Sequence, residues 1–305
     1  MKTYKIFIST VIILSVIISC GKKNPKNSTN SETVLYRDYI PTSLPKDTTK
    51  LWIEDSNIEK DTVLIVGEGG PKGSLDFQSN GRIYWEYLNN YNNYKTLVIH
   101  QSSTYNPTIF NAKKFTLADG YKEADISAEI LYRAIKYYKN RNKYVIVAGH
   151  SYSAFIIPYY IASRPSLADK YLITGGRLNA DSIQTYYQLK GYNSGFKDDG
   201  KTLIIPDTTL PRKQYRTERY FKIRNVKEML KAGIGNYKFT DKLKDKDLSN
   251  IIFFYGKYDE NVGALSKLEI DFLESKNVKV FGVETNHYRI WQRVIDSARA
   301  GKIKL

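Results

Sequence analysis

Short apolar runs alternate along this chain with longer segments in which apolar residues recur every three to four positions. The runs predict buried strands, because each is continuous over four or five positions and rich in β-branched or aromatic side chains. The amphipathic segments predict helices, most clearly where Ile126, Ile130 and Ala134 share one face. Strands that alternate with helices are typical of a mostly parallel sheet covered by helices on both faces, so the sequence predicts the α/β class.

The alternation extends over most of the chain. The predicted strands lie at 62–66, 96–100, 144–148, 171–174, 251–255 and 279–283. The predicted helices lie at 82–91, 126–138, 154–163, 263–275 and 288–300. Composition agrees with a folded chain, since 42% of the residues are hydrophobic and 13% are aromatic. A chain of 305 residues can form one large α/β domain.

The first twenty residues predict a leader outside the folded domain. Residues 1–5 include two lysines, residues 6–18 are mostly apolar but too short to span a bilayer comfortably, and Cys20 follows. This arrangement resembles a bacterial lipoprotein signal, in which Cys20 becomes the acylated first residue of the mature chain. A plain secretory signal or an uncleaved anchor is the alternative. Cys20 is the only cysteine, which excludes an intrachain disulfide and a cysteine metal cluster.

The segment 21–50 is rich in Lys, Asn, Ser, Thr and Pro and lacks apolar periodicity. Such a composition predicts a flexible tether between a membrane and the folded domain, which is expected at 51–305. With the lipid at Cys20, we expect a protein of the bacterial cell envelope that is anchored to a membrane and faces the periplasm or the exterior.

A serine follows one predicted strand in the sequence Gly149-His150-Ser151-Tyr152-Ser153. A serine on a sharp turn between a strand and a helix has an exposed hydroxyl, and the helix N-terminus offers free N–H groups to a developing oxyanion. Gly149 and Ser153 are small, as this turn requires where strand and helix approach closely. An ordinary surface serine on a strand–helix connection is the alternative, because the pattern recurs by chance.

An acid and a histidine follow the last two predicted strands, at Asp259 and His287. Serine, aspartate and histidine in this order, each after its own strand, resemble the α/β-hydrolase family over residues 50–300. The resemblance implies that His287 takes the proton of Ser151 while Asp259 holds the imidazole. It also implies an α/β-hydrolase fold in which the long interval 177–248 is a cap inserted before the acid-bearing strand.

Other side chains could take these roles. Glu260 is adjacent to the predicted acid, and Asp181 or Asp207 could replace that acid only through a different topology. The sequence has three histidines in all. His150, beside the serine, is expected to pack or to shape the pocket, and His100 is expected to be a core residue or to line the pocket.

A glycine-rich loop follows the first predicted strand. Its run Gly-Gly-Pro at 69–71 resembles the His-Gly-Gly-Pro-Gly loop of proline iminopeptidases and related α/β-hydrolases. Glu68 stands in the place of the histidine and Lys72 in the place of the final glycine. A phosphate-binding loop is the competing interpretation, but the Lys-Ser/Thr ending of such a loop is absent.

The N–H groups expected to hold an oxyanion belong to Gly69 or Gly70 and to Tyr152. Ser151 would attack an ester, thioester or amide carbonyl, and water would then hydrolyse the acyl-enzyme. An esterase is the first expectation. A peptidase of the proline iminopeptidase type is the second, in which an acidic group such as Glu68 would bind the substrate amine. A catalytically silent binding protein of the same fold is a further alternative.

The chain is strongly basic, with a formal net charge of +16. The interval 177–248 holds 16 Lys and Arg against 9 Asp and Glu, a net charge of +7. A basic cap could favour anionic substrates or dock on an acidic envelope surface, although a solvated face explains the charge equally well. No nucleic-acid recognition motif accompanies it, so we expect a small-molecule or peptide substrate and no nucleic-acid partner. Neither a metal nor an organic cofactor is expected.

Overall fold

The structure is a computed structural model and describes residues 36–54, 59–76, 94–209 and 217–304. The leader predicted at 1–20, with its lipidation at Cys20, lies outside the described residues, as does the helix predicted at 82–91. In the described part of the chain, no helix combines the length and the apolar character that crossing a membrane requires.

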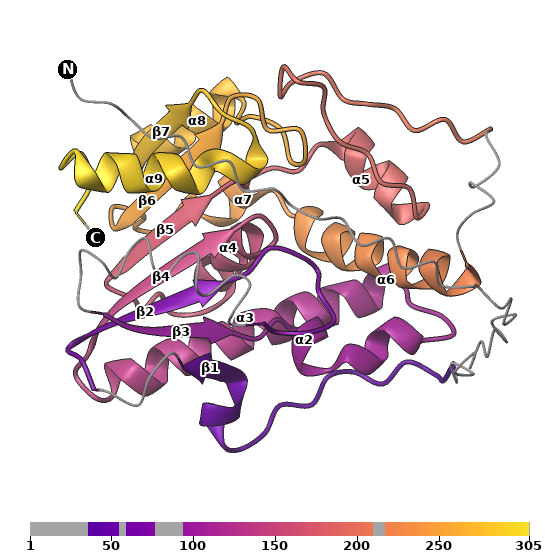
Figure 1. The fold of residues 1–305 in the computed structure, drawn as a ribbon, viewed down its shortest axis with the longest axis horizontal. Helices are drawn as coiled ribbons and strands as arrows, with labels where there is room; N and C mark the ends of the chain where they lie inside the picture. The colour runs from indigo at the N-terminus through magenta and orange to yellow at the C-terminus, as the bar shows by residue number, and fades with distance from the viewer. Residues whose placement is uncertain (1–35, 55–58, 77–93, 210–216, 305) are drawn as a thin grey trace, which may run out of the picture. The chain divides into compact units, whose positions relative to one another are not determined.

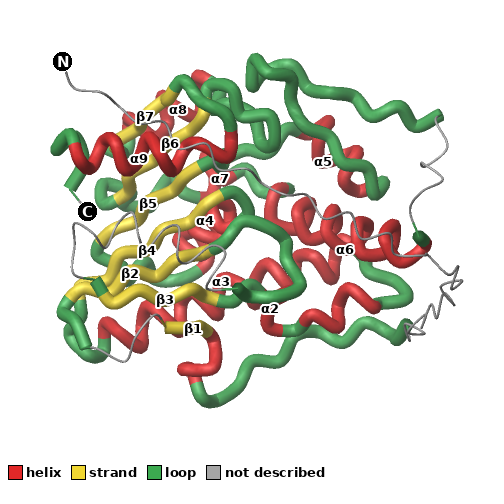
Figure 2. The backbone as a smooth tube through the Cα atoms, in the orientation of Figure 1, coloured by secondary structure: helices red, strands yellow, loops and turns green. Residues whose placement is uncertain are grey.

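Seven strands of the described chain form one sheet in the order β1-β3-β2-β4-β5-β6-β7, which can be followed in Figures 1 and 2. Every neighbouring pair is parallel except β1 and β3. The six predicted strands are therefore confirmed. Only the edge strand β1 is missing from the prediction, because three residues are too few to show a pattern. The strands are β1 (Trp52–Glu54), β2 (Thr62–Gly67), β3 (Lys95–Ile99), β4 (Tyr144–His150), β5 (Lys170–Thr174), β6 (Ile251–Gly256) and β7 (Lys279–Val283).

Helices occupy the connections between the strands. Those predicted at 126–138, 154–163, 263–275 and 288–300 correspond to α3, α4, α8 and α9. Helix α8 begins later than predicted because Gly263 has a φ of 81° and Ser266 caps the helix. The α-helices are α2 (Ser102–Tyr105), α3 (Leu117–Lys139), α4 (Ser153–Ser163), α5 (Ser182–Leu189), α6 (Glu218–Gly235), α7 (Phe239–Lys242), α8 (Lys267–Ser275) and α9 (Ile290–Arg299). The 3-10 helices are η1 (Thr48–Leu51), η3 (Pro107–Asn111) and η4 (His287–Arg289).

The sheet is buried on both faces. Successive side chains of a strand point to opposite faces, so Val145 and Val147 of β4 pack with α3 and α4, whereas Ile146 and Ala148 pack with α9. A strand covered on both faces has no polar side, which is why β4 is a continuous apolar run in the sequence. Because all strands except β1 run the same way, the loops that follow β2, β4, β6 and β7 meet at one edge of the sheet.

Helices α5 and α6 belong to the interval 177–248 and lie beyond the carboxyl ends of the strands in Figure 1. Helix α6 crosses α3 at a pair of glycines, Gly120 and Gly233. A Cβ atom on Gly120 would lie 2.5 Å from the carbonyl oxygen of Met229, and one on Gly233 would meet the backbone of Gly120 even more closely. The two backbones can approach this far only because neither glycine has a side chain.

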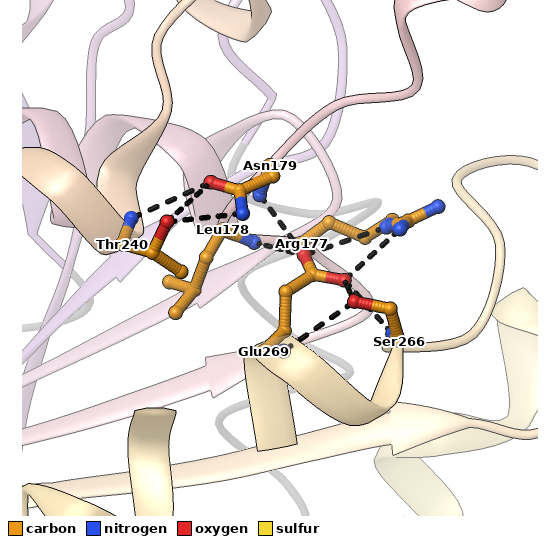
Figure 3. Close-up of polar contacts among 6 residues, drawn as sticks. All are labelled: Arg177, Leu178, Asn179, Thr240, Ser266 and Glu269. Carbon is orange, nitrogen blue, oxygen red and sulfur yellow. Dashed lines mark hydrogen bonds and ion pairs between the residues drawn. The ribbon is translucent and has the colours of Figure 1, made fainter. Parts of the chain in front are cut away.

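A buried carboxylate fastens the start of the same interval to α8. The side chain of Glu269 accepts hydrogen bonds from the backbone N–H groups of Leu178 and Asn179, both at 2.9 Å, and from Nη2 of Arg177 at 2.9 Å. It also accepts from the N–H and the hydroxyl of Ser266, at 2.8 and 2.7 Å. We call this group the cap-base network, and Figure 3 shows it as Arg177, Leu178, Asn179, Thr240, Ser266 and Glu269.

The chain before residue 51 also packs on the domain. The hydroxyl of Tyr39 donates to buried Glu123 at 2.7 Å, and the N–H of Thr42 donates to the same oxygen at 3.0 Å. The composition of residues 21–50 predicts a tether, whereas these contacts show that the packed chain begins earlier than residue 51.

Candidate active site

Ser151 lies on a sharp turn between β4 and α4. Its φ is 56°, in the left-handed region that non-glycine residues seldom adopt, and its N–H donates to the carbonyl of Thr174 at 3.0 Å. A Cβ atom on Gly149 would lie 2.6 Å from Cδ1 of Ile157 and 2.9 Å from the carbonyl oxygen of Ser153. Strand and helix therefore approach as closely as the small residues of the sequence predict, and backbone strain is stored at the serine.

Asp259 and His287 form a buried hydrogen-bonded pair. Nδ1 of His287 and Oδ2 of Asp259 are 2.7 Å apart. The other oxygen of Asp259 accepts from the N–H groups of Asn261 and Val262, both at 2.9 Å. Because a carboxylate only accepts, Nδ1 of His287 carries the hydrogen, and the neutral ring keeps Nε2 as an acceptor. The predicted acid and base thus meet, although they are 28 positions apart in the chain.

Ser151 and His287 line the same cavity, which has a volume of about 880 Å³. No direct hydrogen bond joins their side chains in the described structure, and such bonds are often long before a substrate binds. Apolar and polar side chains both line the cavity. The apolar ones are Phe155, Ala180, Phe196, Ile204, Ile234, Val262 and Trp291, and the charged ones are Lys72, Asp198, Lys231 and Glu260.

His150 stacks beside His287 with ring centroids 4.7 Å apart. Nδ1 of His150 lies 3.0 Å from the hydroxyl of Thr174, and this hydroxyl donates to the carbonyl of Gly149, so Nδ1 of His150 is the donor. Burial, followed by the charge of His287, lowers the pKa of His150 to about 3. His150 therefore stays neutral at ordinary pH and shapes the cavity wall, one of the two roles expected for it.

His100 lies apart from the cavity residues named above. Its Nδ1 is 3.0 Å from the hydroxyl of Thr104, and its ring meets that of Tyr105 edge-on at 5.5 Å. Burial lowers the pKa of His100. His100 is a packed residue at the end of β3, which agrees with its interpretation as a core residue.

The glycine loop passes directly beside the serine. A Cβ atom on Gly69 would lie 3.3 Å from Cβ of Ser151, and one on Gly70 would lie 2.8 Å from Oε1 of Gln101. Gly69, Gly70 and Tyr152 all line the cavity. Among the described residues, their backbone N–H groups have no hydrogen-bond acceptor, so all three remain available to a bound oxygen.

Gln101 is a site residue that the sequence analysis misses. Its buried side chain donates from Nε2 to the carbonyls of Glu68 and Gly69, at 2.8 and 3.0 Å. The hydroxyl of Ser153 donates to the carbonyl of Glu68 at 2.5 Å. These bonds fix the carbonyl groups of the glycine loop and so orient its N–H groups. The only signal in the sequence is a polar residue just after a predicted strand, which is too common to single out Gln101.

The carboxylate of Glu68 is buried and lies 3.4 Å from Nζ of Lys72. Glu68 was expected to bind a substrate amine if the protein is a peptidase. The carboxylates that line the described cavity are instead those of Asp198 and Glu260. Oε2 of Glu260 accepts the backbone N–H of His287 at 3.1 Å. In the described part of the chain, no group of three His, Cys, Asp or Glu side chains is arranged to hold a metal ion.

Comparisons with known proteins identify the fold. No protein-family model and no curated protein sequence matches the chain. The solved structure of Est1E from Butyrivibrio proteoclasticus with ferulic acid bound is 16% identical, with a TM-score of 0.50 over 82% of this chain and 93% of that one. A structure from the metagenome-derived lipolytic enzymes LipS and LipT is 10% identical, with a TM-score of 0.50 over 83% of this chain and 96% of that one. At such low identity the likeness concerns the fold alone, and this chain has the α/β-hydrolase fold.

Proposed function

We propose that the protein is a serine hydrolase that cleaves an ester or amide bond through an acyl-enzyme. The observation that carries the proposal is the buried 2.7 Å hydrogen bond between Asp259 and His287, at the wall of the cavity that Ser151 also lines. A buried acid that holds Nδ1–H leaves Nε2 free to accept a proton, which a general base requires. The strained turn at Ser151 supports the same assignment, because strain of this kind clusters at functional sites.

The reaction would proceed in two halves. His287 removes the hydroxyl proton of Ser151 as its oxygen attacks the carbonyl carbon, and Asp259 stabilises the imidazolium that forms. The N–H groups of Tyr152 and of Gly69 or Gly70 donate to the oxyanion of the tetrahedral intermediate. His287 then protonates the leaving group. In the second half it activates a water molecule, which releases the acid and restores Ser151.

An esterase is the first candidate within this class. Est1E with its bound ferulic acid and the lipolytic LipS and LipT have the same fold, which supports activity on esters. Because a fold alone does not determine activity, the site has to support the same assignment. The mixed apolar and polar lining of the cavity suits an acyl chain that also carries a polar group.

A peptidase of the iminopeptidase type is the second candidate, and Glu260 supports it. Its carboxylate lines the cavity and is bonded to the backbone N–H of His287. It could therefore bind a substrate amine close to the scissile bond. Glu260→Gln should then reduce cleavage of aminoacyl amides far more than that of neutral esters, and an equal loss on both would exclude this role.

The test of the proposed function uses the full-length protein in detergent and a fluorophosphonate probe. Wild type should be labelled, and Ser151→Ala should not. Ser163→Ala, at the exposed end of α4, is the matched control and should be labelled like wild type. A folded wild type that stays unlabelled would instead favour a catalytically silent binding protein of the same fold.

We also propose that Cys20 carries the lipid that anchors the protein to a membrane of the bacterial envelope. The support is the sequence alone, in which the only cysteine follows an apolar leader. Wild type grown with a labelled fatty acid should incorporate the label and sediment with membranes. If Cys20→Ala incorporates the label equally, the anchor lies elsewhere.

A further inference from the structure

Two lysines line the cavity, and each is held by a buried glutamate. Nζ of Lys72 lies 3.4 Å from Oε2 of Glu68. Nζ of Lys231, on α6, lies 3.1 and 3.3 Å from the two carboxylate oxygens of Glu228. The lysine side chains are 35% and 31% exposed, whereas the glutamate side chains are 1% and 3% exposed. Each pair therefore presents its positive end to the cavity and keeps its negative end in the protein.

The first pair accounts for the two departures of the glycine loop from the loop of proline iminopeptidases. Glu68 and Lys72 replace the histidine and the last glycine of that loop, and here they bond to each other across Gly69 and Gly70. The loop that passes beside Ser151 thus gains an ammonium group at its far end.

The second pair comes from a distant part of the sequence but joins the same positive region. Burial lowers the pKa of Lys227, one turn before Lys231, and the charges of Lys231, Arg224 and Lys72 lower it further, with Glu228 acting in the opposite direction. Lys72 of the glycine loop and Lys231 of α6 both line the cavity, so each of these two segments contributes an ammonium group to its wall.

Stability alone does not explain these pairs, because buried ion pairs are often no more stabilising than apolar side chains of similar volume. We propose that Lys72 and Lys231 form an anion subsite that binds a carboxylate or phosphate of the substrate, away from the scissile carbonyl. This rests on the proposed hydrolase function and adds its substrate class, esters that carry a negative charge. The cavity carboxylates Asp198 and Glu260 lie on other segments of the chain than the two lysines.

The test compares matched esters in the full-length protein. One pair is the 4-nitrophenyl monoester of adipic acid and the uncharged 4-nitrophenyl heptanoate, which differ in a charge on the acyl side. The other pair is 4-carboxyphenyl hexanoate and its methyl ester, which differ in a charge on the leaving group. In at least one pair, wild type should have a higher kcat/KM for the charged member, and added salt should reduce this preference.

The variant that tests the subsite is Glu228→Gln/Lys231→Gln, which removes both charges and keeps the volume and the hydrogen bonding. Its preference for the charged ester should fall at least about tenfold, the usual size of a lost hydrogen bond to a charged group. The control Lys267→Gln/Asp271→Asn removes an exposed pair on α8, 2.6 Å apart, and should keep the wild-type preference.

Each outcome decides the proposal. A wild type that hydrolyses neutral esters without preferring the charged ones overturns the anion subsite alone. A preference that survives in Glu228→Gln/Lys231→Gln also overturns it, because other residues must then bind the negative charge of the ester. A wild type that hydrolyses no ester and binds no fluorophosphonate overturns the proposed function, and the subsite with it.

Discussion

The active-site edge and the cap-base network each contain a buried carboxylate after β6. The two carboxylates differ in the hydrogen-bond donors that satisfy them. At the cap base, Glu269 accepts from a guanidinium, three backbone N–H groups and a hydroxyl, all of which keep their hydrogens at every ordinary pH. At the active-site edge, Asp259 accepts two backbone N–H groups on one oxygen and the imidazole of His287 on the other.

The difference separates a structural from a chemical use of the same group. Every donor to Glu269 is fixed, so its charge can only hold the start of the interval 177–248 against α8. One donor to Asp259 is a ring whose charge changes when it takes a proton, so this carboxylate can stabilise a transient state. Removing the negative charge should therefore damage folding at Glu269 and turnover at Asp259.

The largest effect is expected at Asp259. Asp259→Asn should lower kcat for ester hydrolysis by about 10³–10⁴-fold, because an amide favours the wrong tautomer of His287 and cannot stabilise the imidazolium. Urea unfolding should change little, since an amide fills the same space. Asp271→Asn, an exposed change of the same kind, should leave kcat as in wild type. A loss of kcat below about tenfold would assign the acid to another residue, with Glu260 the first to test.

At Glu269 the effect should appear in stability instead. Glu269→Gln should lower the free energy of unfolding by about 3 kcal/mol, because it leaves the guanidinium of Arg177, whose side chain is only 13% exposed, without its charge partner. The folded fraction should retain kcat. Urea titration and activity measured on the same samples would separate the two quantities. If Glu269→Gln is as stable as wild type but inactive, Glu269 serves catalysis and not stability.

A smaller effect on catalysis is expected from Gln101, which we regard as a positioning residue. Gln101→Leu removes the hydrogen bonds to the carbonyls of Glu68 and Gly69 and the one accepted from the N–H of Lys72, so the loop N–H groups should no longer be oriented toward the oxyanion. We expect kcat to fall about tenfold, less than for the loss of an oxyanion donor itself, while KM changes little. Gln101→Glu offers two acceptor oxygens and no donor to the carbonyls of Glu68 and Gly69, so it should not restore kcat. A rise in KM with kcat unchanged would mean that the loop only binds substrate.

The smallest effect should be seen in how the free energy of unfolding depends on pH in the acidic range. Burial acts to raise the pKa of Glu269, but the charge and hydrogen bonds of Arg177 and the backbone N–H groups outweigh it and leave this pKa below the ordinary value of 4.5. A lowered pKa adds stability that is complete above the unfolded value and is lost as pH falls through the folded one. Wild type should therefore lose more stability than Glu269→Gln below about pH 4.5. Parallel pH profiles would exclude this contribution.

The features that can be predicted from the sequence are those in which a local pattern and a local chemistry coincide. The run before Ser151 is apolar on both faces of β4, and Gly149 and Ser153 permit the turn that follows, so strand, turn and nucleophile candidate are all visible in one stretch. Asp259 and His287 could be paired because chain order and the parallel sheet bring their loops to one edge. The fold class follows from the same alternation.

The features that the sequence does not reveal depend on contacts between distant segments. Gln101 matters only because the glycine loop passes over it, and a lone glutamine after a strand carries no such information. The role of Glu68 depends on its pairing with Lys72, and a composition rich in polar residues hides the contacts of Tyr39 and Thr42 with Glu123. The interval 177–248 has no periodic signal strong enough to predict how α6 crosses α3.

That crossing has a consequence for which substrates the cavity can accept. Gly233 lies two positions after Lys231, so the point where α6 touches α3 is also the point that holds this ammonium group. If Lys231 binds the anion of the substrate as proposed, the span from Ser151 to Lys231 sets a preferred distance between the ester and that anion. Among monoesters of dicarboxylic acids with a growing number of methylenes, hydrolysis should peak at one chain length and fall on either side. Gly233→Ala should broaden the dependence of hydrolysis on chain length. An equally sharp peak in that variant would mean that another part of the cavity sets the preferred length.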